Sequence, residues 1–417
     1  MITRATCRVC AGSMEPVLDL GEHFVSDFIS PGDSDGTKAP LELVICRKCR
    51  LLQLKHTVPG ETMYRNYWYR SGTNQTMRTA LADIANKAET LIHLHEGDSV
   101  VDIGCNDGTL LACYKTGGIR KIGFDPAENL AVFSRKIADK LVVGYFEAEA
   151  FRSDADLRGR RPKIVTSIAM FYDLETPNKF VSDIKSVMDP EGLWIVQMSY
   201  LPLMLKTNEF GNICHEHLEY YSLTSFEYLL NLHGFGIVDV ELNDINGGSL
   251  RAYIRNRDAD PNRFADATYR ELAGERVQSL REQEVRLGLE DIGVYREFAV
   301  WVNRIKEDVV GFIKEQVARG KTVYVYGAST KGNTLLQYFG LDRTVIAAAA
   351  ERNPDKWGKV TVGTRIPIVS EEEARAAKPD YFLVLPWHFL EEFRLREKAY
   401  LLSGGKFIVA MPHFTLI

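Results

Sequence analysis

The sequence lacks any run of about 20 apolar residues, so no transmembrane helix is predicted. Its N-terminus, MITRATCRVC, has no apolar core of a signal peptide, and we expect a cytoplasmic location. An excess of basic residues is also missing, because 51 Lys and Arg face 56 Asp and Glu, giving a net charge of -5. Nucleic-acid binding needs a basic face, so this balance argues against a nucleic-acid partner. A small anionic ligand held by a few local charges remains compatible with it.

Cysteine is scarce, with 7 among 417 residues, too few for a disulfide framework in a chain of this length. Four of them form two CxxC pairs, Cys7 with Cys10 and Cys46 with Cys49. Each pair can occupy a tight turn with both sulfurs facing one tetrahedral ion. The alternative is four buried or redox-active cysteines. The identical spacing of the pairs and the neighbouring basic residues favour a structural Zn²⁺ site.

Helical and strand-like stretches alternate through the middle of the chain. A helical pattern over 76–95 precedes a buried strand over 99–104, and strand-like runs recur at 121–124, 163–167 and 193–198. This alternation is typical of a doubly wound α/β sheet. A charged helical region over about 260–318 then leads into a second α/β unit. Its expected strands lie at 321–326, 344–348, 381–385 and 406–410.

The segment over 100–111 combines a strand, a glycine turn and the start of a helix. Gly104 lets the backbone approach a ligand closely, and Gly108 permits tight packing of helix on strand. Asp125 ends the next expected strand, where an acid can accept the hydroxyl groups of a ribose. The pattern from Asp102 is DxGxxxG, whereas dinucleotide folds usually have GxGxxG. A generic nucleotide-binding turn is the alternative.

Residues 212–222, NICHEHLEYYS, are the densest polar cluster of the chain and follow a strand that ends near residue 199. His215 and His217 would not share a helix face, although they would share the face of a strand. A metal site and two histidines satisfied within a turn therefore stay open as alternatives. We favour a general base, because histidine titrates near neutral pH and the adjacent Glu216 can orient it.

Together, the paired CxxC motifs, the DxGxxxG segment, the HEHxxYYS segment and the second α/β unit resemble the sugar C-methyltransferase family over essentially the whole chain. Members of that family use S-adenosylmethionine (SAM) to methylate C-3 of nucleotide-linked 4-keto-deoxysugars. The resemblance implies an α/β fold: a class I methyltransferase Rossmann-like domain, a small N-terminal zinc-binding domain and a second C-terminal Rossmann-like domain. We expect boundaries of 1–70 for the zinc-binding domain, 71–258 for the SAM-binding domain and 259–417 for the helical connector and substrate-binding domain.

The family also implies roles for particular residues. It makes His217 the general base, beside Glu216, and adds a tyrosine from the segment Tyr67-Trp68-Tyr69, in which we favour Tyr69. The expected cofactor-binding residues are Asp102, Gly104, Asn106, Gly108, Asp125, Ser167 and Ala169. The expected substrate-binding residues are Tyr67, Cys214, His215, Tyr221, Lys331, Asn333 and Arg251. The chain departs from the family at Cys214, where tyrosine is frequent, and within 170–173, where a histidine is frequent, and both departures bear on the acceptor.

The second α/β unit has a turn, Gly327 to Asn333, between a strand and a helix. Backbone amides at such a helix start suit phosphate, and Lys331 adds charge, while a purely structural turn is the alternative. Arg251, which follows two glycines, could also meet a phosphate. The family implies that this unit helps to hold a nucleotide-linked sugar.

The expected reaction begins when His217 removes a proton from a carbon next to a ketone. Tyr69 then stabilises the enolate oxygen, and positioning provides much of the remaining catalysis, with no need for a metal. The alternatives are an O- or N-methyltransferase, a zinc and Rossmann binding module, and a dehydrogenase or epimerase that uses NAD. The HEH cluster and the pI of about 6.1 argue against the binding module. The sequence leaves the nucleotide, the sugar, the methylated atom and the oligomeric state open.

Overall fold

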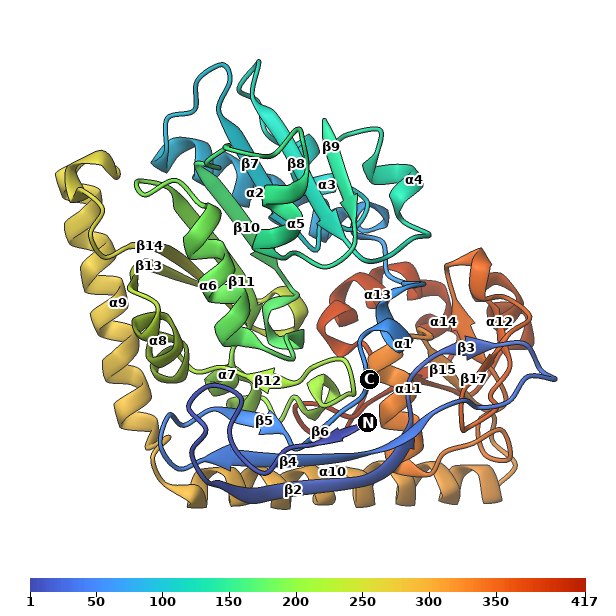
Figure 1. Ribbon diagram of the computed structural model, residues 1–417. Helices are drawn as coiled ribbons and strands as arrows, with labels where there is room; N and C mark the ends of the chain where they lie inside the picture. Colours follow the sequence, from blue (N-terminus) through green and yellow to red (C-terminus); the bar gives the residue numbers. More distant parts are fainter.

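The computed structural model describes residues 1–417, which form three units joined by two long helices (Figure 1). The N-terminal unit lies along the bottom of Figure 1, the middle unit stands above it, and the C-terminal unit lies on the right. Helix α9 (Ala267–Leu287) runs along the left side and α10 (Ile292–Ala318) along the bottom. The two helices therefore carry the chain from the middle unit, beneath the N-terminal unit, to the C-terminal unit.

The N-terminal unit is built on an antiparallel sheet with the strand order β12-β5-β4-β2. Its edge strand β12 comes from the HEH region, more than 160 residues further along the chain, and pairs Glu219 with Gln53 and Tyr220 with Leu52. The HEH segment is thus tied into the sheet of the N-terminal unit. The strands of this unit are β1 (Ile2–Thr3), β2 (Met14–Phe24), β3 (Phe28–Ile29), β4 (Lys38–Cys46), β5 (Leu52–Leu54), β6 (His56–Thr57) and β12 (Glu219–Tyr220).

The middle unit contains a seven-stranded sheet in the order β13-β14-β11-β10-β7-β8-β9, in which β14 runs antiparallel to both of its neighbours. All five residues of β7 are buried, as expected for a parallel strand covered on both faces. Its strands are β7 (Ser99–Ile103), β8 (Arg120–Asp125), β9 (Lys140–Val143), β10 (Ile164–Ile168), β11 (Leu193–Ser199), β13 (Phe235–Asn243) and β14 (Ser249–Asn256).

Helices cover this sheet because their apolar residues recur at helical spacing. In α2, the buried Leu81, Ile84 and Ala88 form one stripe, and the side chain of Asn74 caps the helix by accepting from the amide of Thr76 at 2.8 Å. The helices of this region are α1 (Glu61–Tyr64), α2 (Gln75–Leu91), α3 (Thr109–Ala112), α4 (Ala131–Ser134), α5 (Ala148–Ser153), α6 (Pro177–Val187), α7 (Leu201–Lys206) and α8 (Leu223–Leu232).

The C-terminal unit repeats the α/β plan in a six-stranded sheet with the order β18-β16-β15-β19-β20-β21. The Ser329 hydroxyl accepts from the amide of Gly332 at 3.0 Å and so fixes the start of α11. Its elements are β15 (Val323–Tyr326), α11 (Thr330–Phe339), β16 (Ala349–Glu351), β17 (Val360–Thr361), β18 (Ile368–Ser370), α12 (Glu371–Ala377), β19 (Tyr381–Val384), α13 (Leu390–Arg396), α14 (Lys398–Leu402), β20 (Lys406–Val409) and β21 (Thr415–Leu416).

Short 3-10 helices connect several of these elements. They are η1 (Ser71–Thr73), η2 (Phe171–Asp173), η3 (Phe210–Asn212), η4 (Ile245–Gly247), η5 (Pro261–Arg263), η6 (Pro354–Lys356) and η7 (Trp387–Phe389).

Direct contacts hold the three units together. Strand β3 of the N-terminal unit pairs with β17 of the C-terminal unit, and the side chain of Gln337 bonds both the amide and the carbonyl of Phe24. Helix α9 packs on β13, where Arg276 meets the fully buried carboxylate of Asp239 at 2.7 and 2.8 Å. The domain boundaries expected from the sequence stay predictions, and part of the expected connector is packed against the middle sheet.

The predicted alternation of strands and helices is present in both α/β units, with one displaced strand. A strand was expected over 344–348, whereas β16 covers 349–351. Residues 342–345 instead form a turn, in which the side chain of Asp342 accepts from the amide of Thr344 at 2.8 Å. Among the helices, none combines the length and the apolar run that crossing a bilayer requires.

Candidate functional site

The four predicted metal ligands meet beside the N-terminal sheet. The Sγ atoms of Cys7 and Cys49 lie 3.5 Å apart, those of Cys10 and Cys46 lie 3.3 Å apart, and all four atoms lie within 4.8 Å of one another. The amide of Val9 points at the Cys7 sulfur from 3.4 Å, which favours the thiolate. Four thiolates in this arrangement fit one tetrahedral zinc ion and fill its coordination positions.

A chain of hydrogen bonds leads from this cysteine cluster toward the HEH segment. Gln53 on β5 donates to the sulfur of Cys7 at 3.2 Å and accepts from the amide of Arg8 at 3.1 Å. The neighbouring amide of Leu54 donates to the carbonyl of Leu218 at 2.9 Å, directly after the HEH residues. The cysteine cluster therefore supports the strand on which the HEH segment ends.

The glycine turn after β7 opens at the carboxyl end of the middle sheet. Gly104 has φ +73°, and a Cβ atom there would lie 3.0 Å from Cγ of Met170, so the position requires glycine. Asp125 at the end of β8 accepts from the amides of Asn106 at 2.7 Å and Ala127 at 2.8 Å. Burial raises the pKa of Asp125. The turn and the acid form one hydrogen-bonded unit.

Two further residues expected to bind the cofactor, Asn106 and Asp102, are held by side-chain hydrogen bonds. The side chain of Asn106 accepts from the amide of Ser71 and donates to the carbonyl of Tyr69, both at 3.0 Å, so it fastens the tyrosine segment over the turn. Asp102 accepts from the Thr166 hydroxyl at 2.6 Å, and burial raises the pKa of Asp102 to about 7. Both Asn106 and Asp102 line the cavity described next.

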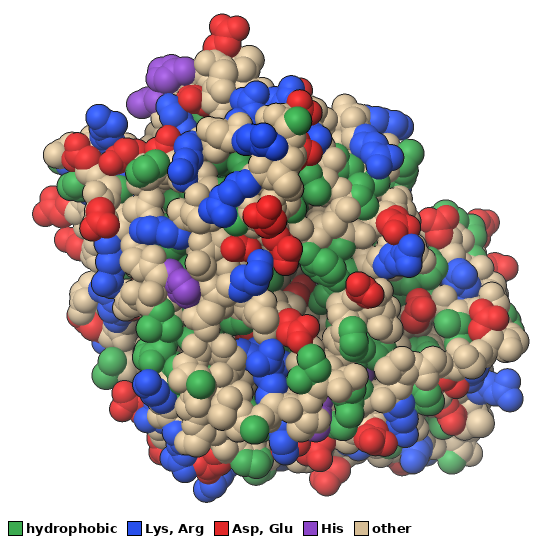
Figure 2. Space-filling model, in the orientation of Figure 1, with side chains coloured by type: hydrophobic (Ala, Val, Ile, Leu, Met, Phe, Trp, Pro, Cys, Tyr) green, Lys and Arg blue, Asp and Glu red, His purple; other side chains and the backbone are tan.

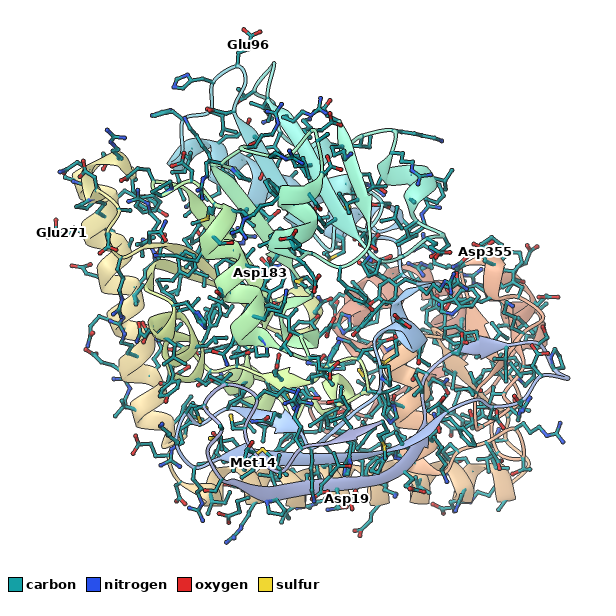
Figure 3. The ribbon with its side chains drawn as sticks, viewed as in Figure 1. Met14, Asp19, Glu96, Asp183, Glu271 and Asp355 are labelled. Atoms are coloured by element: carbon teal, nitrogen blue, oxygen red, sulfur yellow. The ribbon has the colours of Figure 1, made fainter.

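A cavity of about 820 Å³ extends from this turn to the C-terminal unit. Figure 2 shows a hollow between the middle and C-terminal units, with acidic and hydrophobic side chains around it. Figure 3 labels Asp355, one of its lining residues, at the upper edge of the C-terminal unit. Pockets of this size suit a ligand of several hundred daltons. Predicted site residues that line the cavity are Tyr67, Tyr69, Asp102, Gly104, Asn106, Asp125, Ala169, Glu216, His217 and Lys331.

His217 lies in the turn between η3 and β12. Its Nδ1 lies 2.8 Å from the main-chain carbonyl of Asn212, so Nδ1 carries the proton and Nε2 keeps its lone pair. Burial, and then the charge of Lys331, lower the pKa of His217 well below its ordinary value. The ring packs edge-on against Tyr172 with the centroids 4.4 Å apart. A neutral, oriented imidazole of this kind can accept a proton.

Two acids, the buried Glu216 and the half-buried Asp173, line the cavity beside this histidine. Burial raises the pKa of Glu216 to about 7, against the opposing effect of Lys331. Burial and the charge of Glu216 raise the pKa of Asp173 well above its ordinary value, and Oδ1 of Asp173 has no hydrogen-bond partner. One ligand atom each of Cys214, Glu216 and His217 lies within 4.8 Å of the others. Glu216 is thus close enough to stabilise a protonated His217.

Lys331, in the first turn of α11, reaches from the C-terminal unit into the same cluster. Its Nζ donates to the side chain of Asn212 at 2.6 Å, and the carbonyl of Asn212 holds the His217 ring. Lys331 therefore supports the residue that orients His217.

Three tyrosines approach the site, Tyr64 at the end of α1 and Tyr67 and Tyr69 in the segment that follows it. The Tyr64 hydroxyl donates to the carbonyl of Glu216 at 3.0 Å, and the rings of Tyr64 and Tyr67 lie 6.1 Å apart. Burial, then the charges of Glu216 and Asp173, raise the pKa of Tyr67 well above its ordinary value. Tyr69 is 42% exposed. Tyr67 thus faces the HEH cluster, whereas Tyr69 lies on the side of the glycine turn.

Several predicted site residues do not line the cavity. Arg251 is buried and paired with Asp83 at 2.6 Å and Glu241 at 3.1 Å, so its charge is used within the middle unit. His215 turns toward the N-terminal unit, where Nε2 lies 2.9 Å from the carbonyl of Ala39. The remaining residues of this kind are Asn333, which donates to the carbonyl of Asp27, Ser167, which accepts from Trp194, Gly108, which packs against Ile137, and the buried Cys214 and Tyr221.

Other cavity residues were given no role from the sequence. Tyr64 lacks any local motif, whereas Asp173 lies within 170–173, where the chain departs from the family, but no role for it followed from that departure. Glu209, whose pKa burial raises to about 7, bonds the indole N–H of Trp387. Glu351 is the last residue of β16. Because this strand was predicted over 344–348, Glu351 was not recognised as an acid at the end of a strand.

Comparison with known proteins gives matches to consecutive parts of the chain. Three family models match: a "putative zinc binding domain" over 7–64, a methyltransferase domain over 70–240 and a C-methyltransferase C-terminal domain over 244–412. The C-methyltransferase NovU of Streptomyces niveus is 32% identical over 410 residues, which cover 97% of this chain and 95% of that relative. The chain belongs to the C-methyltransferase family. The cavity, the glycine turn and the cysteine cluster are therefore features of a C-methyltransferase.

Solved structures align with part of this C-methyltransferase. The plantazolicin methyltransferase BpumL in complex with SAH is 15% identical, covers 43% of this chain and 84% of its own, and has a TM-score of 0.34. The magnesium protoporphyrin IX methyltransferase ChlM from Synechocystis PCC 6803 with bound SAM is 14% identical, covers 44% and 80%, and has a TM-score of 0.31.

The family membership confirms the main predictions about fold and cofactors. The C-methyltransferase is a SAM-dependent enzyme whose middle unit is a class I Rossmann-like domain, followed by a C-terminal α/β domain. Its N-terminal unit is a zinc-binding domain, and the four clustered cysteines are the residues that fit the ion.

Proposed function

We propose that this C-methyltransferase methylates C-3 of a nucleotide-linked 4-keto-deoxysugar, with His217 as the general base. The observation that carries the proposal is a buried histidine at the junction of the two α/β units, whose Nδ1 lies 2.8 Å from the carbonyl of Asn212. One wall of the cavity there holds the glycine turn and Asp125, and the other wall holds Lys331. A substrate with a reactive sugar at one end and an anionic carrier at the other fits such a cavity.

The base acts on a carbon acid. A proton on the carbon next to a ketone is acidic because the resulting enolate spreads its charge onto oxygen. Nε2 of His217 takes this proton, and the C–H electron pair moves into the enolate. Glu216, within 4.8 Å, stabilises the imidazolium that forms. SAM, when bound against Gly104 and Asp125, supplies an electrophilic methyl group.

A hydrogen-bond donor is needed for the enolate oxygen. The sequence pattern favours Tyr69 in this role. The surroundings of the two tyrosines instead favour Tyr67, because the nearby charges of Glu216 and Asp173 help to raise the pKa of its hydroxyl. The raised pKa keeps this phenol protonated, so it can donate to an oxyanion. Tyr69, held by its carbonyl to Asn106, then serves as a wall between the two ends of the cavity.

Substrate testing gives the direct measurement. The enzyme is incubated with SAM and a panel of nucleotide-linked 4-keto-6-deoxysugars, and products are followed by mass spectrometry and NMR. We expect one added methyl group on ring carbon 3. In D₂O without SAM, we expect exchange of the C-3 proton that His217→Gln abolishes. Methylation on oxygen or nitrogen, without C-3 exchange in any sugar, would overturn the proposal and favour an O- or N-methyltransferase.

A further inference from the structure

The turn between η3 and β12 gathers three different metal-ligating side chains. The amide of His217 donates to the carbonyl of Cys214 at 3.1 Å, which closes the turn and brings its two ends together. Cys214, Glu216 and His217 then offer a thiol, a carboxyl group and an imidazole whose ligand atoms all lie within 4.8 Å of one another. The four sulfurs of the zinc cluster meet the same limit. The turn therefore forms a second group of potential ligands, outside the zinc-binding domain of residues 7–64.

The hydrogen bonds around His217 match those of a metal ligand. Nδ1 donates to the carbonyl of Asn212 at 2.8 Å, so the lone pair of the unprotonated ring lies on Nε2. Histidines that bind a metal through one ring nitrogen usually donate the other N–H to a carbonyl or a carboxylate, which fixes the tautomer and the ring. Asn212 is itself held by Nζ of Lys331 at 2.6 Å. The imidazole is therefore oriented before any ion arrives.

The surroundings of this turn carry an excess of acidic groups. Asp173 on η2 lines the same cavity as Glu216, and its Oδ1 is buried without a hydrogen-bond partner. Burial and then the charge of Glu216 raise the pKa of Asp173 well above its ordinary value, so the two carboxyl groups lie close together. The thiol of Cys214 adds a third acidic group, against the nearby ammonium of Lys331. A divalent cation would balance these charges and give Oδ1 of Asp173 a partner.

We infer that Cys214, Glu216 and His217 form a second metal site, which takes a zinc-like divalent cation from the cavity and blocks the proposed base. Glu216 and His217 line the cavity, and the sulfur of Cys214 lies beside them. Thiolate and imidazole ligands favour Zn²⁺ over Mg²⁺ and Ca²⁺, and binding releases the thiol proton to solvent. The ion uses the lone pair on Nε2 that takes the substrate proton, so the metal-bound and catalytic states exclude each other. The site stands on the side-chain geometry, and only its effect on turnover rests on the proposed function.

Metal binding to the full chain tests the site without a substrate. The chain, with zinc in the cysteine cluster, is dialysed against Zn²⁺, and its metal content is measured by mass spectrometry. We expect two zinc ions per chain in the wild type, and in Cys214→Ser an affinity for the second ion that is at least about tenfold lower. Cys113→Ser is the matched control and should keep both ions. Co²⁺ added to the zinc-loaded chain should give a thiolate-to-metal absorption band that Cys214→Ser lacks, because Co²⁺ binds more weakly than Zn²⁺ and leaves the cysteine cluster in place.

The effect on turnover is measured with the panel of nucleotide-linked 4-keto-6-deoxysugars. Each enzyme is compared with itself before and after addition of Zn²⁺. We expect the wild-type rate to fall at least about tenfold and to recover with an equimolar amount of EDTA, whereas the rate of Cys214→Ser falls less than about twofold. Mg²⁺ should change neither rate.

The outcomes separate the metal site from the proposed function. One zinc ion per wild-type chain at every concentration would overturn the inference and leave the proposed function intact. A second ion that persists in Cys214→Ser and in Glu216→Gln would overturn the assignment of the ligands, and either variant decides this if the other does not fold. A second ion that is lost in these variants but leaves wild-type turnover unchanged would support the site and overturn the proposed role of His217.

Discussion

The two α/β units share a topology but present different surfaces to the cavity. In the middle unit, the turn after β7 is held in place by its own surroundings, since Asn106 ties it to the tyrosine segment and Asp125 accepts from the amide of Asn106. In the C-terminal unit, the corresponding turn sends Lys331 across the cavity to Asn212. The first turn is preorganised for a cofactor, whereas the second completes a site that lies mainly in the other unit. The chemistry is therefore assembled across the junction.

The N-terminal unit holds this junction from below. Its sheet includes β12, which continues from the HEH segment, and its strand β3 pairs with β17 of the C-terminal unit. The small N-terminal unit thus contacts both α/β units. We expect the zinc ion to stabilise the geometry between them, besides the fold of its own unit.

The largest effect is expected at the junction itself. His217→Gln should lower kcat about 10³-fold, because it removes the proposed base and leaves the cofactor turn unchanged. The measurement is initial rate under saturating SAM, with SAH affinity as the control. His215→Gln is the matched variant, since His215 turns toward Ala39, and it should lower kcat less than about tenfold. Near-wild-type turnover of His217→Gln would show that the assigned base is wrong.

The zinc-binding unit should give the next effect. Cys46→Ser should lose the ion and lower kcat about 10²-fold, because the sheet that ends in β12 loses its support and the base shifts. Metal content by mass spectrometry and turnover are measured on the same sample. Cys113→Ser, outside the cluster, is the control and should keep both. Full activity of a zinc-free Cys46→Ser would separate the ion from the geometry of the site.

Lys331→Met tests the contact made by the C-terminal unit. We expect kcat to fall about 10- to 100-fold, because Asn212 loses the bond that steadies the carbonyl holding His217. The loss of a nearby cation should also raise the pKa of Glu216 and of His217, so the acid limb of the pH profile, which we assign to Glu216, should move to higher pH. Lys331→Arg should restore part of the rate. An unchanged pH profile would limit Lys331 to substrate binding.

Substitution of Tyr67 and Tyr69 tests which tyrosine near the middle unit donates to the enolate oxygen. Tyr67→Phe should lower kcat about tenfold through loss of the proposed oxyanion donor, and Tyr69→Phe should lower it less. Both variants keep the ring and its packing, so KM for SAM serves as the control. The reverse order would restore Tyr69, the tyrosine favoured by the sequence pattern, to the donor role.

Features encoded by short-range patterns could be predicted from the sequence. The CxxC pairs, the glycine turn with Asp125 and the HEH segment all follow from local spacing, and the structure brings the four cysteines together. A strand end was enough to place Asp125, because parallel strands carry ligands at their carboxyl ends. The alternation of elements sufficed for the α/β class of both units.

Features set by contacts between distant residues could not be predicted. Arg251 was expected to bind a phosphate, but it forms an ion pair with Asp83, 168 residues earlier in the chain. The direction of Tyr67 and Tyr69 depends on Asn106 and the HEH turn, and neither is a neighbour in sequence. The strand predicted to begin at Thr344 begins five residues later, as β16. Thr344 and the apolar residues after it favour a strand, but the side chain of Asp342 accepts from the amide of Thr344 and forms a turn there.

The smallest effect is expected in the pH dependence near neutrality. Burial raises the pKa of Glu216 to about 7 and lowers that of His217 well below its ordinary value, so Glu216 changes charge in this window and His217 does not. Below about pH 7 the carboxyl group is protonated and cannot stabilise the imidazolium that proton transfer creates. The value of kcat/KM should therefore rise several-fold as the pH increases through about 7.

Two variants assign this limb. In Glu216→Gln the rate should be several-fold lower and flat across the same range, because the titrating group is gone. Glu209 offers the control, since burial raises its pKa to about 7 as well while its carboxylate bonds Trp387 of the C-terminal unit. Glu209→Gln should keep the limb. If Glu209→Gln loses the limb instead, the acid that titrates near pH 7 is Glu209, which contacts the C-terminal unit, and the assignment of this limb to Glu216 beside His217 is wrong.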